Sequence, residues 1–306
     1  MAWHALRTGS VAPFPSGNTF AFSSLSTLFA DSPLLSFTLA IITLVGTAGV
    51  MVWINSQFNL LRTVSVFFVA FFIFTACCVP TVTAQFGAPL LLAFTVMLCV
   101  WIMFSIYAAG RSSRRVFLVF ALLSAGGLFD YGFLLYVPVF IAGLGQMRLF
   151  RLKKLVAMAL GVITPPWIAY GMGFVDTFTV PRLYHTPLSD ILSVAGGIPF
   201  LVTVGVLIAT EAIFGVINLF RILGFNARAR AFNGLLSLVA VSTAVYAVIN
   251  FTHLWLYVPL ICATVALQTG LFFRYYANRR AYLVMLILLG GFAGLYLWQI
   301  NTLSVG

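Results

Sequence analysis

Apolar runs alternate with short polar loops along almost the whole chain. Most of these runs are close to the ~20 residues that an α-helix needs to cross a ~30 Å hydrocarbon layer. The pattern therefore predicts a series of membrane-spanning helices. The predicted spans are residues 34–54, 64–79, 89–109, 155–174, 198–220, 233–250, 255–273 and 281–298.

One further run, residues 116–147, is too long for a simple span and contains a single charged residue, Asp130. As a straight helix it would be about 45 Å long at a rise of ~1.5 Å per residue. Its middle is rich in helix-weakening glycine, with Gly126, Gly127 and Gly132 around the aspartate. The run is either one tilted helix or two short helices that turn at Asp130 and return to the starting side.

The distribution of basic residues favours the hairpin. Cytoplasmic loops of membrane proteins carry an excess of Lys and Arg. With a hairpin, all of the 16 basic residues except Arg7 and Arg182 lie on one side. With a single crossing, the basic residues from Arg148 onward, except Arg182, would move to the opposite side. The hairpin places both termini outside. The cytoplasmic set is Arg62, Arg111, Arg114, Arg115, Arg148, Arg151, Lys153, Lys154, Arg221, Arg228, Arg230, Arg274, Arg279 and Arg280.

Composition supports the same fold class. The 306 residues are 62% hydrophobic and 7% charged, whereas soluble domains carry about 25% charged residues. We therefore expect an all-α, polytopic transmembrane helix bundle of about eight full spans plus one glycine-broken hairpin, embedded in a lipid bilayer. We expect an outer N-terminal segment (1–33), a single transmembrane domain (34–298) and a short outer tail (299–306). The net charge of +11 belongs to short loops, so a nucleic-acid partner is not expected.

The few ionisable residues predicted on the outer side, named at the end of this paragraph, could converge on one substrate-binding cavity. In such a cavity an arginine would bind phosphate and a carboxylate would act as a base. Alternatively, the aspartates cap helix starts. Asp130 is the candidate catalytic residue, because a carboxylate at a turn within the membrane is costly, but capping of the turn is an equal alternative. The candidate substrate-binding residues are Asp130, Tyr131, Asp31, Asp176, Arg182, His185 and Asp190.

Glu211 is the second candidate site. It lies in the middle of span 198–220, and ionisable residues at such depth usually have a function. Asn218 follows seven residues later, on nearly the same helical face. Glu211 would either relay protons or bind a cation with Asn218 nearby, or hold a neighbouring helix by a polar contact.

The four cysteines, all within apolar runs, lack metal-ligand spacing. No metal and no cofactor is expected.

The order of features over residues 116–171 resembles a family of uncharacterised multi-pass inner-membrane proteins of Bacteroidetes. FALLSAGGLFDYGFLLYVPVF gives the broken hairpin, and MRLFRLKKLVAMALGVITPPWIAYG gives the basic loop and a Gly-x-x-x-Pro segment before Trp167. The resemblance implies a bacterial cytoplasmic membrane. The hairpin is also similar to the paired half-helices of C-type, polyprenyl-phosphate-sugar-dependent glycosyltransferases. Those enzymes carry an acid in a large outer loop after the first span, whereas Asp31 precedes the first span here.

Three functions remain open, and with them whether the protein is an enzyme. The first is a cell-envelope protein with glycosyltransferase-like architecture that handles a lipid-linked or polar substrate from the outer side. The second is a transporter or proton-coupled membrane subunit that uses Glu211. The third is a non-catalytic scaffold subunit that binds other envelope membrane proteins.

Overall fold

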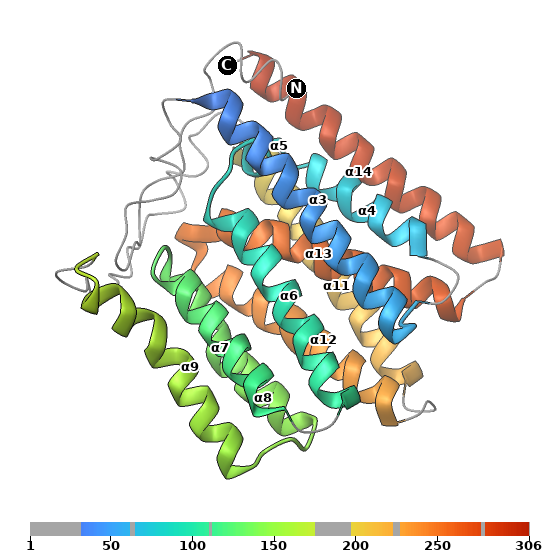
Figure 1. Cartoon of the computed structure of the whole chain (residues 1–306). Coiled ribbons are helices and arrows are strands. Elements are labelled where there is room, and N and C mark those ends of the chain that lie inside the picture. The colour runs from blue at the N-terminus through green and yellow to red at the C-terminus, as the bar shows by residue number, and fades with distance from the viewer. Residues whose placement is uncertain are drawn as a thin grey trace.

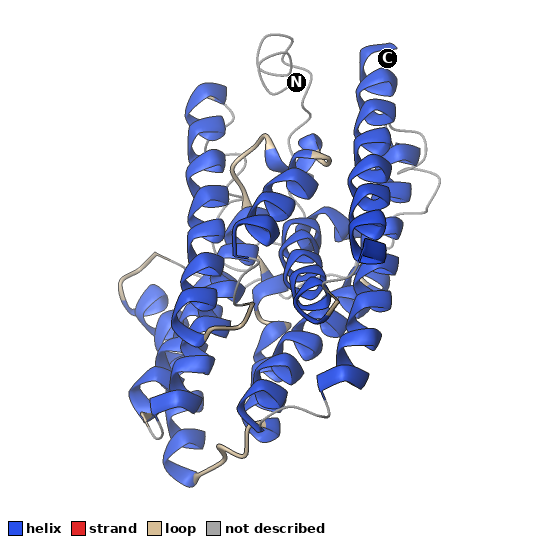
Figure 2. Ribbon diagram, turned by 90° about the vertical axis from the view of Figure 1, so that its right-hand side faces the viewer, coloured by secondary structure: helices blue, strands red, loops and turns tan. Residues whose placement is uncertain are grey.

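The chain folds as a bundle of α-helices (Figure 1). The computed structural model describes residues 32–61, 65–109, 112–174, 197–222, 227–276 and 279–305, and within these ranges it has no strand (Figure 2). Within these described ranges, seven helices are long and apolar enough to cross a membrane. These are α3 (Pro33–Phe58), α6 (Ala88–Ala109), α9 (Leu152–Gly171), α11 (Gly197–Ile222), α12 (Ala227–Ile249), α13 (Leu254–Tyr275) and α14 (Arg279–Val305). The predicted all-α polytopic class is confirmed.

The second apolar run forms a shorter helix than the span expected over 64–79. Helix α4 covers Ser65–Cys77 and a separate short helix, α5, begins at Pro80 and ends at Thr83. Proline lacks the N–H that would continue the helix. The Thr83 hydroxyl hydrogen-bonds the carbonyls of Ala76 and Val79, at 3.1 Å each, and so ties α5 back to the end of α4.

The long apolar run breaks at Asp130, as the hairpin hypothesis predicts. Helix α7 (Ser113–Gly127) is followed by a 3-10 turn, η1 (Tyr131–Phe133), and by α8 (Tyr136–Gln146). The two arms lie side by side and run in opposite directions (Figure 1). A Cβ on Gly126 would come within 2.2 Å of the Phe133 ring, so the chain can fold back here because this residue has no side chain.

Helix α13 is the centre of the bundle. Every residue from Leu256 to Phe272 is buried, and α13 packs against α4, α6, α11 and α12. A helix that is hydrophobic and buried all round needs neighbours on every side. Any polar side chain on this part of α13 must therefore find its hydrogen-bond partners inside the protein.

The helix ends that carry basic residues meet at one end of the bundle, called the basic end below. After α13, Arg274 donates a hydrogen bond to the carbonyl of Leu60, which follows α3. At the start of α12, the Arg228 guanidinium lies 5.9 Å from the centre of the Phe58 ring. Gly143 near the end of α8 packs against Leu235 of α12, so the hairpin returns to this end. The hairpin tip at Asp130 lies at the opposite end.

Candidate functional site

Glu211 lies in the middle of α11 with 4% of its surface exposed. Neither carboxylate oxygen has a hydrogen-bond partner of normal geometry in the described part of the chain. Its carboxyl interacts with the Thr264 hydroxyl of α13 without normal hydrogen-bond geometry. The Thr264 hydroxyl donates within its own helix, to the carbonyls of Leu260 (3.1 Å) and Ile261 (3.0 Å). Buried polar atoms are nearly always hydrogen-bonded. Among the described residues the buried amides of Asn233 and Gln299 also lack partners, and Glu211 is the acidic residue of this group.

A second polar layer lies nearer the basic end of the bundle. The Asn218 side-chain amide donates to the main-chain carbonyl of Gln268 at 2.8 Å and to its side-chain oxygen at 2.9 Å. Gln268 in turn donates to the Ser237 hydroxyl at 3.4 Å. This layer joins α11, α13 and α12. The Asn218 side-chain oxygen has no partner in the described residues, so the layer retains acceptor capacity about two helical turns from Glu211.

A third polar layer joins the hairpin to α12. The Tyr136 hydroxyl donates to the Thr243 hydroxyl at 3.0 Å, and Thr243 donates to the carbonyl of Val239 at 2.7 Å. The Tyr246 hydroxyl donates to the carbonyl of Leu135 at 2.8 Å. Tyr136 is fully buried and interacts electrostatically with Glu211. The hydrogen bonds of this layer therefore join the hairpin to α12.

A fourth layer lies at the hairpin tip. The Asn250 side-chain amide donates to the hydroxyls of Tyr131 (2.7 Å) and Tyr257 (3.2 Å). The His253 ring meets the edge of the Tyr131 ring at a centroid distance of 6.4 Å. Tyr257 interacts electrostatically with Asp130 and with Tyr246, so this layer adjoins the third.

The four layers follow one another along α12 and α13, from the hairpin tip toward the basic helix ends. We refer to this set as the polar column: Tyr131, Asn250, Tyr257, Tyr246, Tyr136, Thr243, Glu211, Thr264, Asn218, Gln268 and Ser237.

Asp130 has a structural role in the turn. One of its side-chain oxygens accepts a 2.8 Å hydrogen bond from the main-chain N–H of Gly132, which makes Asp130 the N-cap of η1. This is the capping alternative that the sequence left open. The residue also lies beside Tyr131 at the head of the polar column, so the geometry is compatible with a further role in binding.

The other predicted outer residues fall outside the described ranges. Asp31, Asp176, Arg182, His185 and Asp190 all belong to this group, and their convergence on one cavity stays a prediction. Among the described residues, no group of three or more His, Cys, Asp or Glu side chains is placed to hold a metal ion.

Sequence reasoning missed most of the polar column. Of its members it singled out Tyr131, Glu211 and Asn218 and passed over the uncharged residues of α12 and α13. A signal was present, since Asn250, Gln268 and Asn218 are amides within or beside apolar runs, where polar side chains form contacts between helices. Tyr136 and Thr243 carried no such signal, because tyrosine and threonine are common in membrane helices.

Comparison of the chain with protein-family models, curated proteins and solved structures gives no match in any of the three. The fold and the site therefore define its class directly. The protein is a multi-pass α-helical membrane protein, with a buried polar column that contains an unpaired carboxyl.

Proposed function

We propose that this protein is a proton-coupled membrane transporter or transport subunit in which Glu211 takes up and releases a proton. The observation that carries the proposal is the burial of both Glu211 carboxylate oxygens without a hydrogen-bond partner. A charged and unpaired carboxylate at this depth is very costly. Glu211 must therefore bind a proton, or a cation, in at least one state of the protein.

A purely structural role for Glu211 fits the geometry less well. A polar clamp between membrane helices acts through a hydrogen bond to the neighbouring helix. Asn218 and Gln268 make such bonds between α11 and α13, and they already supply the clamp one layer away. Within the described residues Glu211 contacts Thr264 of α13 without comparable hydrogen-bond geometry, so it contributes less to such a clamp than Asn218 does.

The polar column offers a proton route to Glu211. Hydroxyl and amide groups lie on the hairpin side of the carboxyl, at Tyr131, Asn250, Tyr257 and Tyr136. Hydroxyl groups transfer protons when internal water completes the hydrogen-bonded chain, and buried water is typical where polar atoms lack partners. The broken α7–α8 hairpin next to the column also agrees with transporters, whose coupling sites adjoin discontinuous helices.

Infrared difference spectroscopy on the full chain in lipid vesicles tests the proposal directly. The carbonyl stretch of a protonated carboxyl is recorded while the bulk pH is moved from about pH 5 to about pH 9. We expect a band that changes over this range and is absent in Glu211→Gln. A Glu211 band that stays constant at every pH would show a permanently neutral structural residue and would overturn the proposal.

Two controls accompany the measurement. Asp130→Asn removes the other acidic side chain of the described region, so the band from Glu211 must persist in that variant. Glu211→Asp keeps a carboxyl on a shorter side chain, and we expect a shifted but still pH-dependent band. Because Glu211→Gln has nearly the same shape as the parent side chain, its melting temperature in detergent shows whether loss of the band reflects loss of fold.

The handling of a lipid-linked or polar envelope substrate is a second candidate function. It is supported by the grouping of Asp130, Tyr131 and His253 at one end of the bundle and by the resemblance of the hairpin to glycosyltransferase half-helices. In this proposal the tip faces the outer side of a bacterial cytoplasmic membrane, with both termini outside. The scaffold function would instead require a partner membrane protein.

A further inference from the structure

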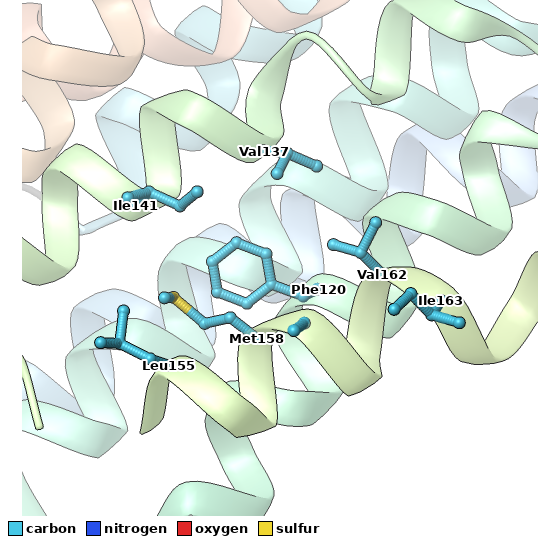
Figure 3. Close-up of a pocket in the computed structure, with 8 residues that line it drawn as sticks. Phe120, Val137, Ile141, Leu155, Met158, Val162 and Ile163 are labelled. Carbon is cyan, nitrogen blue, oxygen red and sulfur yellow. The ribbon is translucent and has the colours of Figure 1, made fainter. Parts of the chain in front are cut away.

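An apolar groove lies between the two arms of the hairpin and α9 (Figure 3). Phe120 of α7, Val137 and Ile141 of α8, and Met158 and Val162 of α9 are among its lining residues. The space measures about 370 Å³ and has almost no polar lining. This volume is in the range of small-molecule sites, which hold about 300–1,000 Å³.

The groove follows the axis of α9. Its α9 residues run from Leu155 to Ile163, which corresponds to about 12 Å at the helical rise. One leaflet of the hydrocarbon layer is about 15 Å deep, half of the total thickness. The groove therefore has the length and the lining that suit an acyl chain within a single leaflet.

Basic residues lie at one end of this groove. Arg151 is the N-cap of α9, one helical turn before Leu155, and Lys153 also lies in this first turn. The side chains of Arg148, Arg151 and Lys153 are exposed. Between residues 131 and 175 the chain contains no Asp or Glu, so this segment provides no acidic side chain that neutralises them. An apolar groove with a positively charged mouth is complementary to an anionic lipid.

The hairpin places further positive charge at the same end. Helix α7 begins with Arg114 and Arg115, and Arg114 is exposed. Arg115 donates a hydrogen bond to the carbonyl of Ser105 at 3.1 Å, which holds its guanidinium against the end of α6. Basic pockets between transmembrane helices on the cytoplasmic side typically bind phosphate headgroups.

We propose that this groove binds an anionic diacyl phospholipid, with one acyl chain against Phe120 and Met158 and the headgroup phosphate at Arg151 and Lys153. Such a lipid would fill the space between the α7–α8 hairpin and α9. The binding site is separate from Glu211 and the proposal does not depend on proton coupling.

Native mass spectrometry of the full chain tests this. The protein is delipidated in detergent and titrated with phosphatidylglycerol or with phosphatidylcholine of identical acyl chains. We expect one phosphatidylglycerol to bind at least ~5-fold more tightly, since one basic residue near a membrane surface contributes about 1 kcal/mol. The variant Arg151→Gln/Lys153→Gln should lose about 25-fold in affinity for that lipid.

A matched variant separates a local site from general charge. Arg221→Gln/Arg279→Gln also removes two positive charges, from the end of α11 and the start of α14 on the far side of the bundle (Figure 1). We expect it to bind phosphatidylglycerol like the parent. An equal loss in both double variants would show only general electrostatic attraction and would overturn the site.

A second pair of variants tests the groove itself. Ala159 lines the groove, so Ala159→Phe should fill it and reduce binding several-fold. Val156→Phe adds a ring on a part of α9 that does not line the groove, and it should leave binding unchanged. Unaltered binding by Ala159→Phe would contradict the proposal. The proposal would also be contradicted if a polyprenyl phosphate displaced the phospholipid at a much lower concentration than that of the phospholipid itself. The groove would then be a site for a lipid-linked substrate.

Discussion

The hydroxyl of Ser124 on α7 donates a 2.6 Å hydrogen bond to the main-chain carbonyl of Val162 on α9. In an unbroken helix that carbonyl would accept from the N–H of residue 166, but this residue is a proline and has no N–H. The two helices can approach closely because of Gly161, where a Cβ would lie 2.6 Å from the Phe117 carbonyl oxygen. Ser124 thus replaces a hydrogen bond that Pro166 removes.

We expect Ser124→Ala to lower the free energy of unfolding by about 1–2 kcal/mol, because it leaves the Val162 carbonyl without a partner inside the membrane. The measurement is denaturant unfolding in detergent micelles. Thr164→Ala is the control: its hydroxyl bonds the Leu160 carbonyl within the same helix at 2.6 Å, where the main chain is already satisfied, so the loss should be small.

A double variant isolates the relationship with the proline. Pro166→Ala restores the N–H of residue 166, which can then bond the Val162 carbonyl within α9. In that background Ser124→Ala should cost less than half of what it costs in the parent chain. Equal costs in the two backgrounds would show that the serine acts on something other than the carbonyl freed by the proline.

The cap at the hairpin tip gives a prediction about Asp130. The side chain of Asn can still accept the hydrogen bond from the Gly132 N–H, whereas Ala cannot. We therefore expect Asp130→Asn to unfold close to the parent temperature and Asp130→Ala to lose about 1 kcal/mol. If Asp130 also serves a lipid-linked substrate, both variants should lose that activity. Full activity of the Asp130→Asn protein would show that Asp130 has only the capping role.

The fold was predictable because the bilayer restricts the choices. Runs such as 89–109 and 233–250 have the length of a span, and only helices or closed barrels satisfy the backbone in lipid. The hairpin was predictable from Gly126, Gly127 and the basic loops. The exact end of α4 was not, since Pro80 marks the break only to within a few residues and the helix already ends at Cys77.

The site was predictable only in part. Glu211 is visible in the sequence because charge is rare in a span. Its surroundings are not visible, because Thr264 lies on another helix and the residues of a helix buried all round show no polar face. The bond between Tyr136 and Thr243 joins residues 107 positions apart. Such pairings depend on which helices are neighbours, and apolar spans alone do not specify this.

The Tyr136 hydroxyl should control how fast Glu211 exchanges its proton. Tyr136 is buried and interacts electrostatically with both Tyr257 and the carboxyl, so Tyr136→Phe removes a hydroxyl from the proposed route. We expect the infrared band of Glu211 to respond to a pH jump at least ~10-fold more slowly, an increase of about 1.4 kcal/mol in the barrier. Thr243→Val removes the same hydrogen bond but keeps the tyrosine hydroxyl, and it should slow exchange much less. Unchanged exchange in Tyr136→Phe would place the proton route elsewhere.

The hairpin predicts the membrane side of every loop after it, and cysteine labelling can test this. The background lacks the native Cys77, Cys78, Cys99 and Cys262, and single cysteines are placed at positions 114, 130 and 150. A charged thiol reagent should reach 114 and 150 from the same side, because α7 and α8 run in opposite directions. Position 130 should be labelled from the other side or protected. Labelling of 114 and 150 from opposite sides would mean that 116–147 crosses once. The basic residues from Arg148 onward, other than Arg182, would then lie on the opposite side of the membrane from Arg114 and Arg115. The proposed phosphate-binding end of the groove would no longer combine charges from α7 and α9.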